Sequence, residues 1–382
     1  MYYWKYVKLL PLALATHTLQ AATLPDWLAV SGFASTAAAK SDNETPYYYT
    51  RNITDEWCFD CDTIAGLQLD LFPLSWLHAS AQLVKRPADD FSDPELEWAY
   101  LSFEPLGDIK IRAGRLRSPS FMYSQVVFVN QAYPWARLPA EVYDTTAGFT
   151  RFDGVEIIYR TAITDELLLQ IQPYASFGYE IEESEINNVL YDVDVDEQYG
   201  LRFDIESINW SAYLHYIKAR MTITTSEPYI PIFPPGGPYD KPIGFEHLVV
   251  PVNAQRWSFG VNYDWRDFTF IAESTTGKNI GWSAYVSAIY HYDNWSPYLI
   301  YGKRWGEKYE GDNPNASLYN HGDSITVGLR YDIQPNLSVV GEWQHTYAET
   351  NYRGSFTSSN VSDRTDNRAN IVTLGLSYSF AL

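Results

Sequence analysis

The chain has 382 residues, a formal net charge of -20 and an aromatic content of 16 %, which includes 31 tyrosines and 13 tryptophans. So acidic a chain, with no basic stripe to neutralise phosphates, excludes nucleic acid as a partner. Beyond the N-terminal segment there is no run of roughly 20 apolar residues, so a membrane-spanning structure would have to be built from strands.

The N-terminal segment has the order of charge and hydrophobicity that is typical of a secretory signal peptide. Lys5 and Lys8 precede an apolar run from Leu9 to Ala15, and small residues follow at Ala21 and Ala22. The run is too short to span a bilayer. We therefore expect residues 1–21 to be a signal peptide and residues 22–382 to form a single exported domain.

The mature chain alternates between apolar and polar residues in about sixteen segments, each close to the roughly 9–11 residues that a tilted membrane strand requires. The predicted strands are 28–40, 63–72, 76–85, 95–104, 109–116, 154–162, 167–177, 198–205, 210–220, 255–265, 268–276, 282–292, 295–305, 324–333, 337–347 and 371–382. Period-two alternation in every strand predicts an all-β fold, an antiparallel transmembrane β-barrel.

The two faces of these strands differ in chemistry. In the last strand, Val372, Leu374 and Leu376 alternate with Thr373 and Gly375. A barrel in a membrane meets lipid outside and water or polar side chains inside, so the polar set is expected to face the lumen. The charged residues predicted to face the lumen are Arg202, Asp204, Arg256, Glu273, Arg330, Asp332 and Glu342.

Connections between the predicted strands alternate between short and long. The long ones are 41–62, 117–153, 178–197, 221–254, 306–323 and 348–370. This asymmetry is typical of an outer-membrane barrel, with short periplasmic turns and longer external loops.

Two features of the long connections allow alternative interpretations. Cys58 and Cys61 most simply form a structural disulfide in an exported chain, with a redox centre as the alternative, and a zinc site lacks further ligands nearby. The acidic run between Glu180 and Glu197 is either a solvated loop, or a divalent-cation site or cation-attracting vestibule.

The densest basic segment lies at the end of the fifth strand, in Arg112-Ala-Gly-Arg-Leu-Arg-Ser-Pro, and the longest connection follows it. With about sixteen strands, this long third external loop and an aromatic C-terminal strand, the chain resembles the trimeric porins of Gram-negative bacteria. The segment Ala113-Gly-Arg-Leu-Arg117 resembles the anion-leaning or substrate-specific branches of that superfamily. One departure is that Ala381 and Leu382 extend the chain beyond its last aromatic residue.

The resemblance implies a third loop folded into the lumen and a pore constriction formed by Arg112, Arg115, Arg117, Arg137, Glu141 and Asp144. The first three arginines would form a basic wall that faces the two acids on the loop, and such charged linings select solutes. The alternative is that they pair with acids of neighbouring strands. The resemblance also implies a homotrimer in the outer membrane, in contact with lipid and lipopolysaccharide, that passes small hydrophilic solutes or ions without a cofactor.

Two other classes of function are compatible with the same barrel. An outer-membrane enzyme would need a catalytic set, but the seven histidines show no distinctive spacing and no nucleophile elbow or metalloprotease motif is present. An adhesin or scaffold would need no channel, although a barrel of about sixteen strands encloses more volume than its own side chains fill. The sequence therefore favours a diffusion channel, with no catalytic residue and no metal ligand assigned.

Overall fold

A computed structural model describes residues 24–48, 51–87, 94–146, 150–186, 189–225, 230–232, 244–277, 281–306, 321–349, 354–356 and 366–382. The predicted signal peptide, residues 1–21, lies outside these ranges. The statements below concern the described residues.

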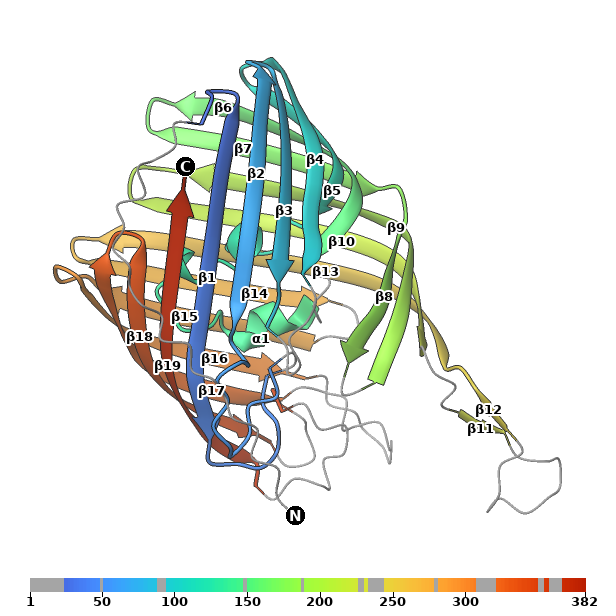
Figure 1. Cartoon of the computed structure of the whole chain (residues 1–382), viewed down its shortest axis with the longest axis vertical. Helices are drawn as coiled ribbons and strands as arrows, with labels where there is room; N and C mark the ends of the chain where they lie inside the picture. The colour runs from blue at the N-terminus through green and yellow to red at the C-terminus, as the bar shows by residue number, and fades with distance from the viewer. Residues whose placement is uncertain are drawn as a thin grey trace.

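Sixteen antiparallel strands, each paired with its neighbours in the chain, close into a barrel (Figure 1). The first strand closes the ring by pairing with the last, from Ser31 opposite Ala381 to Ser41 opposite Ile371. The strands of the ring are β1 (Leu28–Ser41), β2 (Ile64–Leu74), β3 (Leu77–Lys85), β4 (Glu95–Leu106), β5 (Ile109–Arg117), β6 (Arg151–Thr164), β7 (Leu167–Ser176), β9 (Val189–Glu206), β10 (Trp210–Thr225), β13 (Val249–Trp265), β14 (Phe268–Gly277), β15 (Gly281–Tyr290), β16 (Trp295–Trp305), β17 (Gly322–Gln334), β18 (Leu337–Ala348) and β19 (Arg368–Ala381). Every predicted strand is present, and the predicted all-β barrel is confirmed.

Alternation along each strand separates the two faces of the barrel as the sequence predicts. On β13, Trp257 and Phe259 are 48 % and 42 % exposed, whereas Ser258 between them is fully buried. On β19, Leu374 is 61 % exposed and Thr373 is buried. An outward row of large apolar side chains is unfavourable in water and favourable in lipid, so the outer face suits a bilayer.

Residues 118–146, here named the inner loop, lie inside the barrel. They contain η1 (Ser124–Val126), η2 (Asn130–Ala132), α1 (Ala140–Tyr143) and η3 (Asp144–Thr146). Trp135, Val142 and Tyr143 of the loop share one buried cluster with Tyr285 and Tyr298 of the wall. Figure 1 shows α1 within the ring of strands, and it contacts β14, β15 and β16. The inner loop is thus packed against β14, β15 and β16.

No helix within the described ranges is both long enough and apolar enough to cross a membrane.

The prediction that residues 178–197 form a loop is wrong. β8 (Tyr179–Ile186) pairs with the first part of β9, so the acidic run forms a hairpin that extends from the barrel (Figure 1). Val193 and Val195 are buried while Asp194 and Asp196 are exposed, which is the alternation of a strand. The net charge of this segment suggested a loop, but pairing with β10 on the other side stabilises a longer strand.

The predicted connection 221–254 is also partly strand, because β10 extends to Thr225 and β13 begins at Val249. The short pair β11 (Ile230–Ile232) and β12 (Gly244–Glu246) lies between them. β9, β10 and β13 have 18, 16 and 17 residues. These strands are longer than the roughly 9–11 residues that a membrane strand requires, and their additional residues lie on the side of the long loops.

Candidate functional site

A cavity of about 510 Å³ lies inside the barrel, between the inner loop and the wall formed by β4 to β7 and β9. It extends from the short turn at Gly107 to Phe121 and Met122 of the inner loop. Its charged lining consists of the cations Lys110, Arg112, Arg160 and Arg202 and the acids Glu104, Asp108, Asp204 and Glu206. The cavity is thus a polar space with both signs of charge on its wall.

Most of the cations that line this cavity are paired with a carboxylate. Lys110 Nζ lies 2.7 Å from Glu104 Oε1, and Arg202 Nη2 lies 2.7 Å from Asp204 Oδ1. Arg112 pairs with Glu156 of β6 and lies over the ring of Tyr100. Paired charges expose less net field to a passing ion than an unopposed row of one sign would.

Arg160 differs from the other cations of the cavity. Its Nε donates to the neutral amide oxygen of Gln170 at 2.6 Å, and its side chain is exposed. No carboxylate within the described ranges lies within ion-pair distance of it.

Arg112 and Arg115, both predicted for the constriction, lie on opposite faces of β5. The pairing of β5 with β6 continues through Gly114 without a register shift, so alternation is kept. Arg112 faces the cavity, whereas Arg115 shares the outward face with Leu101, which is 59 % exposed. Arg115 pairs there with Asp153, with Nε 2.9 Å from Oδ1. The expected position of Arg115 in the lumen is therefore corrected.

Arg117 does not form a basic wall opposite the acids of the inner loop. It is buried, with Nη2 2.9 Å from Glu97 Oε1 and its guanidinium about 5 Å from the ring centres of both Trp98 and Phe128. Its Nη1 also donates to the backbone oxygen of Ser124 at 3.3 Å. Arg117 thus attaches the beginning of the inner loop to β4 and β5.

Three further arginines predicted to face the lumen do face it, and each binds the inner loop. Arg202 Nη1 donates to the carbonyl oxygens of Pro119 and Phe121 at 2.8 Å and 2.9 Å. Arg256 Nη2 donates to Ser120 Oγ at 3.0 Å. Because each guanidinium has five N–H donors, it can satisfy loop carbonyls and an acid of the wall at the same time.

Arg330 does both. Its Nη1 donates to the carbonyl oxygen of Tyr133 at 2.7 Å, and its Nε donates to Asp332 Oδ1 at 2.8 Å. The inner loop is consequently held to the wall at several points along its length.

Two buried acids of the wall accept hydrogen bonds from the inner loop. Glu273 accepts from the hydroxyls of Tyr143, Tyr213 and Tyr285, each at 2.6 Å, and from the backbone N–H of Met122 at 2.7 Å. A carboxylate with four donors is well satisfied although it is removed from water.

Glu342 accepts from Tyr298 Oη at 2.7 Å and from the N–H of Ala136 at 3.2 Å. Both of these predicted lumen-facing acids therefore position the inner loop.

Arg137 is the centre of a clamp in the inner loop, three residues before α1. Its Nε lies 2.9 Å from Asp62 Oδ1, and its Nη1 donates to Thr373 Oγ1 at 2.9 Å. Arg51 Nε reaches the same Asp62 oxygen at 2.6 Å. Burial acts to raise the pKa of Asp62, but the two guanidiniums outweigh it and hold that pKa below its ordinary value.

Glu141 and Asp144 lie on a different side of the lumen from Arg112. Glu141 is buried against β16 and β17, where Ser324 Oγ donates to its Oε1 at 2.7 Å. Asp144 begins η3, next to α1. The transverse arrangement expected between the basic wall and these two acids is not formed, because the inner loop carries α1 across the barrel to β14, β15 and β16.

Several residues that hold the inner loop were not predicted. Asp62 carries no signal in the sequence beyond its place next to Cys61 in a long connection. Arg304 donates to the carbonyl oxygen of Ala140. Arg304 and Tyr285 are both buried and occupy inward positions on strands that alternate clearly. Strand alternation alone predicts the inward position of these two side chains, whereas the role of Asp62 depends on the tertiary structure.

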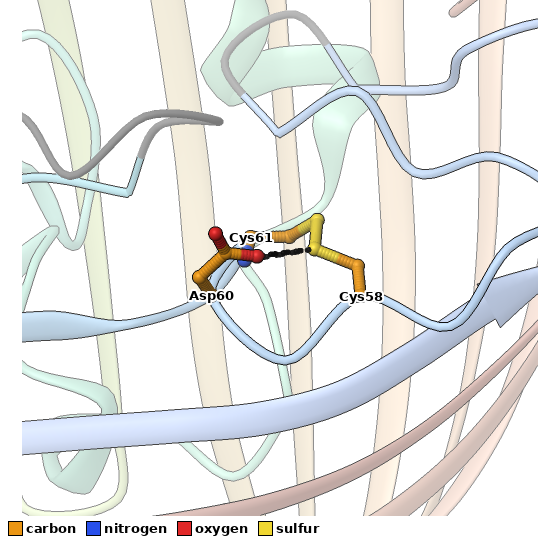
Figure 2. Close-up of side chains that lie close together, drawn as sticks. All are labelled: Cys58, Asp60 and Cys61. Carbon is orange, nitrogen blue, oxygen red and sulfur yellow. Dashed lines mark hydrogen bonds between the residues drawn. A yellow bond between two sulfur atoms is a disulfide. The ribbon is translucent and has the colours of Figure 1, made fainter. Parts of the chain in front are cut away.

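Cys58 and Cys61 form a disulfide with each other, with Cα atoms 5.8 Å apart (Figure 2). Together with Asp60 they are the one group of three potential metal ligands that converge among the described residues. Both sulfurs are used in the disulfide, so no thiolate is left to bind a metal in this state. The described acids of the β8 and β9 hairpin form no such group.

The sequence matches no protein-family model. It also has no match among curated proteins.

Solved structures of outer-membrane barrels, however, share the fold. OmpF of Salmonella typhi has 14 % identity and a TM-score of 0.57, with 92 % of this chain and 97 % of that chain covered. The anion-selective porin from Comamonas acidovorans has 12 % identity and a TM-score of 0.56, with 92 % and 99 % covered. The trimer form of OmpT, an outer membrane protein of Vibrio cholerae, has 12 % identity and a TM-score of 0.57, with 92 % and 99 % covered. The chain has the fold of the outer-membrane porins.

Proposed function

We propose that this chain forms a water-filled channel in the outer membrane of a Gram-negative bacterium, through which small hydrophilic solutes and ions diffuse passively. The observation that carries the proposal is the combination of an apolar outer face with a charged cavity between the inner loop and the wall. A barrel of sixteen strands is wide enough for an aqueous lumen. Such diffusion is driven by the concentration gradient and needs no cofactor.

The surroundings of the channel are part of the same proposal. The outward apolar side chains would contact outer-membrane lipid and lipopolysaccharide, and residues 1–21 would direct export. A homotrimer is supported by the trimer form of the similar OmpT structure. Crosslinking of the protein in detergent, followed by mass measurement, tests this assembly, and a single protomer at all concentrations would reject it.

Single-channel recording in planar bilayers tests the channel itself. Purified, folded protein is expected to give discrete conductance steps, and the heat-unfolded protein in the same detergent serves as the control. Absence of steps from folded protein would reject the channel.

Arg112 and Arg115 offer a matched test of the conducting path, since they are the same residue type on one strand and face opposite sides. Arg112→Gln removes a cation from the cavity wall and is expected to shift the reversal potential in a salt gradient toward cation preference. Arg115→Gln, on the outer face, is expected to leave the reversal potential unchanged. Equal shifts for the two variants would mean that this cavity is not the path of ions.

A further inference from the structure

The disulfide lies directly before the acid that clamps the inner loop. Cys61 is followed by Asp62, and Cys61 is buried in a cluster that includes Tyr48 of the first long loop and Ala140 of α1. Cys58 is half-buried. Figure 2 shows the two sulfurs joined across a tight turn, with Asp60 beside them.

This turn is fixed to the barrel wall on the side of Cys58. The backbone N–H of Cys58 donates to the carbonyl oxygen of Ala39 on β1 at 2.9 Å. The N–H of Ala39 donates to the carbonyl oxygen of Cys58, also at 2.9 Å. Cys61 then donates its own N–H to Cys58 Sγ at 3.0 Å. The disulfide therefore ties the backbone that precedes Asp62 to a strand of the wall.

Asp62 in turn holds the inner loop through Arg137. Its carboxylate oxygens lie 2.9 Å and 3.0 Å from Arg137 Nε, and the two side chains are 5 % and 1 % exposed. A buried guanidinium that loses its carboxylate is left without a counter-charge, so the position of Arg137 depends on that of Asp62. A displacement of the turn is thereby passed to the inner loop.

We propose that the Cys58–Cys61 disulfide is a positioning device for the inner loop, and that a thiol reductant which opens it loosens the Asp62–Arg137 clamp and changes the flow of ions. The effect on ion flow rests on the proposed channel function, whereas the effect on the inner loop does not. The reductant is a small dithiol that approaches Cys58 from the side of the long loops.

The chemical step is ordinary thiol–disulfide exchange. A thiolate of the dithiol attacks Cys58 Sγ, the bond between the two cysteine sulfurs breaks, and Cys61 leaves as a thiolate that takes up a proton. The second thiol of the reagent then attacks the mixed disulfide, so that Cys58 is released as a thiol and the reagent becomes a cyclic disulfide. Two electrons pass from the dithiol to the protein.

The experiment records single channels and hydrogen exchange of the inner-loop amides in the oxidised, dithiothreitol-reduced and reoxidised protein. Reduction is expected to raise the rate of current fluctuations by roughly fivefold, the low end of the coupling between two sites. Amide exchange of residues 135–138 and of residue 140 should rise by the same factor. Reoxidation is expected to reverse both changes. A reduced protein with unchanged fluctuations and unchanged exchange would overturn the proposal.

Variants separate positioning through Asp62 from general loosening. The double variant Cys58→Ser and Cys61→Ser is expected to behave like the reduced protein. Dithiothreitol should change neither its current fluctuations nor its amide exchange. The current of Asp62→Asn is expected to fluctuate rapidly even before reduction. Reduction should raise its fluctuation rate little further, because two changes that act through the same contact are not additive. Asp62→Glu, which keeps the charge, is expected to restore part of the response. Asp42→Asn, in the same loop but bonded to Asn370, is the control and should respond like the unaltered protein.

The two readouts distinguish the proposals. If no conductance is found in any state but exchange still rises on reduction, the channel fails and the positioning role stands. If channels are present and neither readout changes, the channel stands and the positioning role fails.

Discussion

Gly302 shows how a single residue of the wall accommodates the inner loop. A Cβ atom built at this position of β16 would lie 2.5 Å from both Cδ and Oε2 of Glu141. The carboxylate of Glu141 occupies the space that a side chain would take, and Ser324 holds it there. Without a side chain at Gly302, the Glu141 carboxylate can lie directly against β16.

Gly302→Ala is expected to displace the Glu141 carboxylate and to lower the free energy of unfolding by about 1–3 kcal/mol, through overpacking and the loss of the bond from Ser324. Single-channel current should change as well, because α1 moves. Thermal unfolding in detergent and bilayer recording measure the two effects.

Gly341→Ala is the matched control. Gly341 also lies in a strand of the wall, β18, and a Cβ atom there would meet nothing within 4 Å. This substitution is expected to leave the current unchanged and to alter stability by less than about 1 kcal/mol. Equal losses for the two variants would show that any alanine in these strands is harmful and that the fit to Glu141 has no special role.

At the scale of elements, the inner loop is held by separate attachments to many strands of the barrel. Arg117 and Arg202 fix its beginning, whereas Arg330 and Asp62 bind Tyr133 and Arg137 in its middle. Most of these attachments join a charged side chain to a backbone group or to an opposite charge, and such bonds are stronger than neutral ones. Acid should therefore weaken the attachments that depend on a carboxylate, such as that of Asp62 to Arg137, because protonation removes the negative charge.

Asp62 is expected to set the acid limit of the clamp. The pKa of Asp62 is lowered by Arg137 and Arg51 despite burial, and the phenols of Tyr48 and Tyr133 lie nearby without adding charge at neutral pH. A carboxyl group whose folded pKa is depressed stabilises the fold above its unfolded pKa and loses that contribution as pH falls through the folded value. The part of the current fluctuations that depends on the Asp62–Arg137 clamp should stay constant from neutral pH to about pH 4 and rise only below it.

Asp62→Asn tests this assignment, because an amide does not titrate in this range. The variant should fluctuate already at neutral pH and lack the acid-dependent rise, as measured by single-channel noise from pH 7 to pH 3. If the noise of the variant still rises below about pH 4 as in the unaltered protein, another carboxylate causes the acid-dependent rise.

At the scale of the whole molecule, the outer face determines where the protein is stable. Leu374 lies near the middle of β19 and is 61 % exposed, whereas Leu382 follows the end of the same strand and is 54 % exposed. Both are leucines on the outer face, and they differ in their distance from the end of the strand. Substitutions at these two leucines test whether lipid surrounds the middle of β19.

Leu374→Arg is expected to destabilise the barrel by roughly 2–4 kcal/mol in lipid vesicles, because a cation at mid-membrane loses its hydration, while Leu382→Arg should cost about 0–1 kcal/mol near the interface. Reversible unfolding by denaturant from vesicles measures both values. Equal costs for the two arginines would contradict a membrane that surrounds β19.

How far the sequence predicts the fold follows from the spacing of its side chains. The sixteen strands and the outward position of residues such as Trp257 and Leu374 were predictable, since period-two alternation is local and lipid enforces it on every strand. The acidic charge of residues 178–197 predicts a loop, whereas the alternation of buried Val193 and Val195 with exposed Asp194 and Asp196 accompanies a hairpin. Arg112 was placed correctly in the lumen, whereas Arg115 depended on the register at Gly114.

The amino-acid sequence by itself determined the barrel, its two chemically different faces and the inward position of Arg202, Arg256, Glu273 and Arg330, because each follows from neighbours two residues apart. Only the tertiary structure decided what these side chains bind. The inner loop crosses the lumen, so its partners are residues far away in the chain, such as Asp62 for Arg137 and Ser324 for Glu141. Contacts of this kind depend on the path of the loop through space, which no local periodicity encodes.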